Sequence, residues 1–328
     1  MSDKLPRRKF IKNTAMAAAG AAALPHLSFA GKKKTHFDAK DLVTRPLGKT
    51  GVDVPILAFG AGSRWMSVKD DDQALAILEY ALDQGVYFWD TAASYGNARI
   101  SSEERIGKLL PSRRKEVFLV TKTQRRGADA AKAEIEQSLK RLNTDYIDLL
   151  HVHSIESVED AESLGDKGKV LEVLHDYRDQ GIVKHIGFTG HTTPEGMRRA
   201  AALSDFEAMM IALNHHGRSS GKNFEGVATP AAAKGIGIIA MKVIRPRESV
   251  PELDPADLVK YSLSLPHFAT ANIGTDSTEV LNMNLALARN FEPLSDQKMD
   301  ELTVKMEPFF RGERVAWMQP GYVDGQVT

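Results

Sequence analysis

Eight short apolar runs, each followed by an amphipathic stretch, constrain the fold of this chain more than any other feature. Short apolar runs bounded by turn residues are typical of buried parallel strands. The stretches between them have helical periodicity, and eight strand–helix units predict an α/β fold of the (β/α)₈ TIM-barrel type over residues 44–328. The expected strands are Ile56–Gly60, Val86–Asp90, Val117–Thr121, Tyr146–His151, Val183–Phe188, Ala208–Leu213, Gly237–Lys242 and Thr270–Ile273.

The helical stretches carry recognisable start and stop signals. Asp70–Asp72 supplies an N-cap, an apolar stripe follows, and Gly85 ends the first stretch. Ahead of the barrel, Leu47–Val52 predicts the turn of a short N-terminal hairpin. A doubly wound nucleotide-binding sheet is disfavoured, because no G-x-G-x-x-G follows any strand and no Walker A loop is present. Further helices are expected at Ala130–Leu142, Gly168–Gln180, Pro194–Ala202, Phe224–Lys234, Pro255–Leu265 and Glu279–Arg289.

Composition excludes several classes of function. The 43 basic and 43 acidic residues cancel, which argues against a nucleic-acid partner because such proteins carry a strong basic excess. The chain has no cysteine, so disulfides, thiol catalysis and thiolate metal centres are excluded.

The first thirty residues have the layout of a cleavable signal peptide. A basic start with Arg7-Arg8 precedes an Ala-rich apolar run, and the small residues before Gly31 suit cleavage after Ala30. The Arg pair resembles a twin-arginine export signal, which implies the twin-arginine export machinery as a partner and a periplasmic location. The run is too short for stable membrane insertion after cleavage. Residues 31–43 then predict a basic, solvated linker.

Chemistry in such barrels takes place at the C-terminal ends of the strands. There the sequence places Asp90 and Tyr95 after the second strand, Lys122 at the third and His153 at the fourth. A phenol is a poor acid at neutral pH, but a nearby ammonium stabilises the phenolate. A buried Asp can hold that ammonium, and a His can hydrogen-bond a substrate oxygen. The set suits protonation of a carbonyl oxygen as hydride arrives at its carbon.

These residues lie in motifs through which the chain resembles the aldo-keto reductase family. The motifs are Leu47–Pro55 (LGKTGVDVP), Asp90–Gly96 (DTAASYG), Thr121-Lys122, Asp145–His153 (DYIDLLHVH) and Ile186–His191 (IGFTGH). The resemblance implies a barrel that binds extended NADP(H) or NAD(H) without a Rossmann domain. Together with the export signal, it implies an exported oxidoreductase that transfers hydride between nicotinamide and a small carbonyl or alcohol.

By the same resemblance, Tyr95 is the proton donor, Lys122 tunes it, Asp90 supports Lys122 and His153 orients the carbonyl. The family's Ser-Asn carboxamide ligands read Thr189-Gly190 here, and two further cofactor contacts read as methionines. The segment of residues 273–284 has no basic residue for a 2′-phosphate, which leaves NADP(H) and NAD(H) both open. The implied cofactor residues are Thr189, Gly190, Met210, Met241, Lys242, Gly274, Ser277 and Asn284.

Three other interpretations stay open at this point. The barrel can be a non-catalytic cofactor-binding or regulatory subunit. A metal-dependent hydrolase would use His151 and His153, which alternate on one strand face, with His191, His215 and His216 as further ligands. Gly217–Gly221 matches the G-x-S-x-G pattern of serine hydrolases, although a flexible loop explains it as well. Because the periplasm has no free nicotinamide pool, export also predicts a tightly held cofactor.

Overall fold

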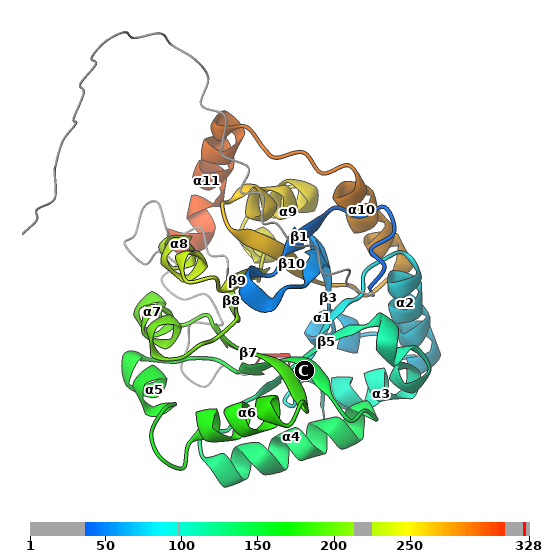
Figure 1. The fold of residues 1–328 in the computed structure, drawn as a ribbon. Helices are drawn as coiled ribbons and strands as arrows, with labels where there is room; N and C mark the ends of the chain where they lie inside the picture. The colour runs from blue at the N-terminus through cyan, green and yellow to red at the C-terminus, as the bar shows by residue number, and fades with distance from the viewer. Residues whose placement is uncertain (1–36, 98, 213–224, 312–323, 326–328) are drawn as a thin grey trace, which may run out of the picture. The chain divides into compact units, whose positions relative to one another are not determined.

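The computed structural model describes residues 37–97, 99–212, 225–311 and 324–325 of the chain. Within them, eight parallel strands close into a barrel in the order β10-β3-β4-β5-β6-β7-β8-β9 (Figure 1). Each neighbouring pair is parallel, as at the pairing of Lys122 with His151 between β5 and β6, and the register shifts once, between Phe268 and Thr270 in the pair of β10 with β9. The strands are β3 (Leu57–Gly60), β4 (Phe88–Asp90), β5 (Phe118–Thr123), β6 (Ile147–Val152), β7 (Val183–Gly190), β8 (Ala208–Ala212), β9 (Gly237–Met241) and β10 (Phe268–Gly274).

All eight expected strands are confirmed, and no end is shifted by more than two residues. The barrel is buried on both faces, since most strand residues are fully inaccessible, which is why the runs are continuously apolar rather than alternating. The helices form a ring around it (Figure 1). They are α1 (Ser63–Met66), α2 (Asp71–Asp83), α3 (Ser102–Arg113), α4 (Ala128–Leu142), α5 (Val158–Ser163), α6 (Val170–Asp179), α7 (Pro194–Leu203), α8 (Glu225–Ala233), α9 (Pro255–Ser264), α10 (Thr278–Arg289) and α11 (Asp296–Arg311), with 3₁₀ turns η1 (Gly48–Thr50), η2 (Arg114–Glu116) and η4 (Arg245–Glu248).

The N-terminal hairpin is also confirmed and closes the end of the barrel opposite the expected site. β1 (Thr44–Pro46) and β2 (Asp53–Pro55) pair antiparallel around η1. Leu47 is fully buried, and the amide of Lys49 donates to the carbonyl of Gly235, just before β9 begins. The C-terminal ends of the strands therefore remain as the mouth of the barrel.

The segment just before the hairpin packs more closely than a solvated linker does. The ring of Phe37 stacks on Tyr87 at 5.0 Å between centroids, and Leu42 is buried. The apolar residues of this segment, Phe37, Ala39, Leu42 and Val43, therefore pack against the barrel, whereas its charged residues are exposed. The expected signal peptide, residues 1–30, and the rest of the expected linker lie outside the described residues.

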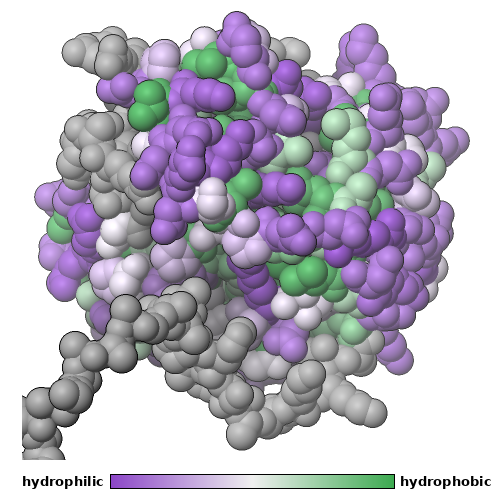
Figure 2. All heavy atoms as spheres, turned by 90° about the horizontal axis from the view of Figure 1, so that it is seen from above, coloured by the Kyte–Doolittle hydropathy of each residue, from purple (hydrophilic) through white to green (hydrophobic). Residues whose placement is uncertain are grey.

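The surface presented in Figure 2 is mainly polar, with apolar side chains in small separate groups. Among the described residues, Met283 and Val304 are the large apolar side chains that are clearly exposed. In the same part of the chain, no helix combines the length and the apolar character that crossing a bilayer requires.

Candidate active site

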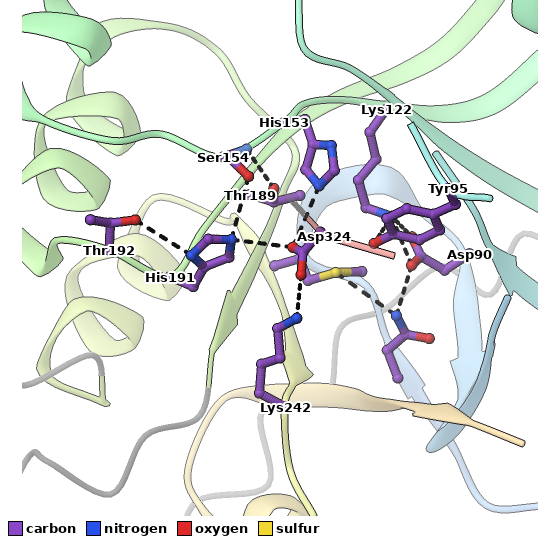
Figure 3. A network of polar contacts seen from close by, with 12 residues as sticks. Asp90, Tyr95, Lys122, His153, Ser154, Thr189, His191, Thr192, Lys242 and Asp324 are labelled. Carbon is purple, nitrogen blue, oxygen red and sulfur yellow. Dashed lines mark hydrogen bonds and ion pairs between the residues drawn. The ribbon is translucent and has the colours of Figure 1, made fainter. Parts of the chain in front are cut away.

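The four residues predicted to carry the chemistry converge at the mouth of the barrel (Figure 3). Lys122 Nζ lies 2.7 and 2.8 Å from the two carboxylate oxygens of Asp90. It also donates to the carbonyl of Thr91 at 2.6 Å and to Tyr95 Oη at 3.3 Å. The rings of Tyr95 and His153 meet edge to face at 5.9 Å. The four side chains are at most 7% exposed, so their charges act on one another with little screening by water.

The start of α3 holds Tyr95 in place. Ser101 and Glu104 form a capping box, and the amide of Ser102 donates to the carbonyl of Tyr95 at 2.9 Å. The hydroxyl of Ser102 donates to the carbonyl of Ala61 at 2.7 Å and so ties this loop to the end of β3. Tyr95 is therefore positioned by backbone contacts, which leaves its hydroxyl directed at Lys122.

Burial dominates the electrostatics of the ionisable groups. It raises the pKa of Asp90 and lowers that of Lys122, and in each case the attraction of the partner opposes the shift. Burial lowers the pKa of His153 to about 4, which keeps its imidazole neutral at physiological pH. A neutral His153 can donate one hydrogen bond to a carbonyl oxygen without competing with Tyr95 as the acid.

Two neighbours of this tetrad (Asp90, Tyr95, Lys122 and His153) are not predicted from the sequence. Asn272, on β10, donates from Nδ2 to Asp90 Oδ2 at 2.7 Å and so helps to fix the carboxylate that Lys122 also contacts. Asp324, from the C-terminal tail, places its carboxylate 3.2 Å from His191 Nε2 and 3.6 Å from His153 Nε2. It also pairs with Lys242. Asn272 lies in an expected strand but in none of the motifs, and Asp324 lies in a tail without periodicity, so long-range packing brings both to the site.

A cavity of about 470 Å³ runs from the tetrad along the ends of β9 and β10. Its size is within the range usual for small-molecule and cofactor sites. Three arginines line it, Arg64 from α1 and Arg245 and Arg247 from η4, and Arg64 forms an ion pair with Asp276 at 2.7 Å. These cations and the strand-end backbone suit the phosphates of an extended dinucleotide. At the tetrad end, Asp324 and Gly325 form part of the wall.

Of the predicted cofactor residues, Met241, Lys242 and Gly274 line this cavity. Ser277 instead caps α10 by accepting from the amide of Val280 at 3.2 Å, and Asn284 is half-buried on the same helix. The lining of the cavity in the described residues includes neither of these two.

The positions that replace the family's carboxamide ligands are filled by packing. A Cβ at Gly190 would lie 2.3 Å from Met197 Sδ, so the space of an asparagine side chain is taken by that methionine. Thr189 Oγ1 accepts from the amide of Ser154 at 2.9 Å. Met210 is fully buried, with its sulfur 3.9 Å from Asn272 Nδ2. The carboxamide-binding side chains of the family pattern are therefore absent at these three described positions.

The described residues give little support to the metal-hydrolase and serine-hydrolase interpretations. His151 points into the barrel interior, where neither ring nitrogen has a hydrogen-bond partner among them, and burial holds its pKa well below the usual range. Within the described ranges, no group of three His, Asp or Glu is arranged to hold a metal ion. His215, His216 and the Gly217–Gly221 motif lie outside these ranges.

Comparisons with known proteins agree with this geometry. Residues 57–245, more than half of the chain, match the model of the aldo/keto reductase family. L-galactose dehydrogenase of Arabidopsis thaliana is 34% identical over 160 residues, which cover 44% of this chain and 48% of that protein. D-threo-aldose 1-dehydrogenase of a Pseudomonas species is 29% identical over 195 residues, or 49% and 57%. The matches therefore span about half the length of these curated relatives.

Solved structures match over more of the chain. A putative aldo-keto reductase from Pseudomonas aeruginosa is 29% identical, with a TM-score of 0.65, over 79% of this chain and 98% of that one. The holo form of an aldo-keto reductase from Bacillus halodurans has the same TM-score at 21% identity, over 80% of this chain and 96% of that one, and shows the fold alone.

Proposed function

Because the chain belongs to the aldo/keto reductase family, we propose that it is an NAD(P)-dependent oxidoreductase that interconverts small carbonyl compounds and alcohols. The observation that carries this proposal is the buried chain Asp90–Lys122–Tyr95, which ends beside His153 at the mouth of the barrel. A bound nicotinamide dinucleotide would supply the hydride. Everything else in the reaction falls to side chains already in place.

Tyr95 transfers its hydroxyl proton to the substrate oxygen, which becomes the alcohol. The Lys122 ammonium, 3.3 Å from Tyr95 Oη, stabilises the negative charge that develops on the phenol oxygen. Asp90 and Asn272 keep this ammonium charged and aimed at the phenol. His153 holds the carbonyl oxygen within reach of Tyr95, and the burial of all four groups excludes water.

The arginines of the cavity support a preference for the phosphorylated cofactor. We expect NADPH to bind at least about tenfold more tightly than NADH, since a hydrogen bond to a charged group contributes about 1.5–3 kcal/mol. Titration of the protein with each nucleotide, followed by fluorescence, and turnover of a panel of aldehydes test this expectation. Binding of either nucleotide without any turnover would favour the non-catalytic barrel, and absence of binding would refute the proposal.

We also propose export by the twin-arginine route to the periplasm, supported by the sequence of residues 1–30 alone. Changing Arg7→Lys and Arg8→Lys together preserves charge and is expected to hold the protein in the cytoplasm as its full-length precursor. The unaltered chain is expected in the periplasmic fraction with Gly31 as its first residue. Lys33→Arg, beyond the expected cleavage site, is the matched control. Equal periplasmic yields of the double variant and the unaltered chain would refute this route.

A further inference from the structure

The backbone just after His153 is held by a side chain from the neighbouring strand end. Arg126 lies in the loop between β5 and α4, shortly after Lys122. Its Nη2 donates to the carbonyl of His153 at 3.0 Å and to the carbonyl of Ser154 at 2.9 Å. One guanidinium therefore binds two successive peptide groups at the end of β6.

Ser154 turns the chain sharply between these two carbonyls. Its φ is 54°, in the left-handed region, which residues other than Gly, Asn, Asp and His rarely enter. In extended backbone, successive carbonyls point to opposite sides of the strand, so an extended Ser154 would turn one of the two away from Arg126. A serine stays in this strained conformation where the surrounding contacts over-determine it. The contacts with Arg126 are part of that constraint.

Arg126 is itself fixed by contacts on its other side. Its Nε and Nη2 donate to the two carboxylate oxygens of Asp160, on α5, at 2.7 and 2.9 Å. Burial would raise the pKa of Asp160, but Arg126 outweighs this and holds the pKa below its usual value, so both partners are charged at neutral pH. The carbonyl of Arg126 accepts from the amide of Val170 at 2.8 Å, where α6 begins. A two-point contact of this kind fixes the plane of a guanidinium, which a single contact does not.

Thr189 holds the amide side of the same turn (Figure 3). Its Oγ1 accepts from the amide of Ser154 at 2.9 Å, and its carbonyl accepts from the amide of Ile155 at 2.7 Å. Thr189 stands where the family pattern has a serine that binds the nicotinamide carboxamide. In this chain the side chain is 1% exposed and its oxygen is directed at the backbone beside His153.

Both peptide groups that flank the Cα atom of His153 are therefore fixed. The amide of His153 donates to the carbonyl of Thr123 at 2.8 Å, which anchors the group before it. Arg126 and Thr189 anchor the group after it. Because the bonds around Cα are tetrahedral, these two groups set the direction of the Cα–Cβ bond and hence the region in which the imidazole lies. It lies beside Tyr95, with the two rings edge to face at 5.9 Å.

We propose that Arg126 and Thr189 are positioning residues that direct the imidazole of His153 at the substrate oxygen during carbonyl reduction. Arg126 holds the carbonyl side of the turn after His153, and Thr189 holds its amide side. The assignment rests on the proposed function, in which His153 holds the carbonyl oxygen within reach of Tyr95. It adds the two residues on which that role of His153 depends.

A double-mutant cycle separates positioning from a general structural effect. In Arg126→Met, kcat for carbonyl reduction in single turnovers with NADPH is expected to fall at least about tenfold, since misplacing a reacting group by about 1 Å can cost about 10²-fold. Nucleotide affinity is expected to stay unchanged. In the His153→Ala background, the same substitution is expected to leave kcat unchanged, because no imidazole remains to be directed.

Arg199→Met is the matched control for Arg126→Met. Arg199 forms an ion pair with Glu162 at 2.9 Å, also on α5, but both side chains are about half exposed, and the substitution is expected to preserve kcat. Equal losses of kcat from Arg126→Met with and without His153 would overturn the proposal, because a structural effect does not need the imidazole. If the unaltered protein turned over no carbonyl substrate, the proposed function itself would fail instead.

Two milder variants keep the proposal testable if Arg126→Met does not fold. Arg126→Lys keeps a charge beside Asp160 but lacks the planar fork that reaches both carbonyls, so kcat is expected to fall, by less than in Arg126→Met. A kcat equal to that of the unaltered protein would overturn the assignment of Arg126. Thr189→Val removes the acceptor of the Ser154 amide and is expected to lower kcat without weakening NADPH binding, measured by fluorescence titration. Weaker NADPH binding with an unchanged kcat would overturn the assignment of Thr189 and make it a cofactor ligand.

Discussion

Replacing Tyr95 with phenylalanine is expected to lower kcat for carbonyl reduction by about 10²–10⁴-fold, the usual contribution of a positioned general acid. The substitution removes one hydroxyl, which accepts from Lys122 Nζ at 3.3 Å, and keeps the ring that packs near His153. The fold and nucleotide affinity should therefore change little. Single-turnover rates with bound NADPH measure the chemical step directly.

Tyr80→Phe provides the matched control for Tyr95→Phe. The Tyr80 hydroxyl, on α2, donates to Asn282 Oδ1, on α10, at 2.9 Å. Both helices belong to the outer ring and not to the strand ends that form the mouth of the barrel. Its loss should leave kcat unchanged. If Tyr95→Phe retained more than about a tenth of the original kcat, another group would have to protonate the substrate. His153 would then be the first residue to test, since its ring meets that of Tyr95 edge to face at 5.9 Å.

The sequence predicts the barrel and the convergence of four strand-end side chains for the same physical reason. Parallel strands buried on both faces are continuously apolar, so all eight could be seen as separate runs, and their C-terminal ends must share one mouth. Once the strands are placed, Asp90, Tyr95, Lys122 and His153 are brought together by topology alone. The alternation of strands and helices therefore predicts where most residues of the candidate site lie.

Elements whose stability depends on distant contacts could not be foreseen in this way. α3 was not predicted, because it contains Gly107 and Pro111, which normally disfavour a helix interior. Gly107 fits because α3 packs so closely on α4 that a Cβ would lie 2.0 Å from the carbonyl oxygen of Arg141. α11 was likewise missed.

Two further features of the site are not predicted: the position of the C-terminal tail, and the packing around a residue that differs from the family pattern. Asp324 lies in a segment without periodicity, so nothing local indicates that it reaches Lys242. Gly190 shows in the sequence only as a missing asparagine. In the structure, the side chain of Met197 fills the space that the asparagine side chain would need, so the exchange leaves no cavity at Gly190.

Lys122→Met is expected to destabilise the fold by about 3–5 kcal/mol, the range for breaking a buried ion pair by removing one partner. The Asp90 carboxylate is fully buried and would lose its counter-ion, keeping only the hydrogen bond from Asn272 among the contacts described. Burial raises the pKa of Asp90, and without Lys122 nothing of comparable strength opposes that rise. Between the unfolded pKa of about 3.9 and the raised folded value, the folded variant binds the extra proton. Its stability deficit should therefore be small near pH 4 and widen as the pH increases.

Urea unfolding at pH 5 and pH 8 measures this deficit. Lys108→Met is the control, because Lys108 is half exposed and pairs with Asp71 at the surface, where an ion pair contributes less than about 1 kcal/mol. Combining Lys122→Met with Asp90→Asn removes both charges and is expected to recover much of the lost stability. If Lys122→Met were as stable as the unaltered protein at both pH values, Asp90 would have to be neutral in the fold and the ion pair would not exist.

Stability and catalysis should separate in the double variant. It has no ammonium beside Tyr95 Oη, so negative charge on the phenol oxygen would develop without its stabilising partner and kcat should stay as low as in Lys122→Met alone. A neutral pair would then serve the fold as well as the charged pair does. Under the proposed function, the cost of burying two charges at the ends of β4 and β5 would be offset in the transition state, where the ammonium 3.3 Å from Tyr95 Oη stabilises the negative charge that develops on the phenol oxygen.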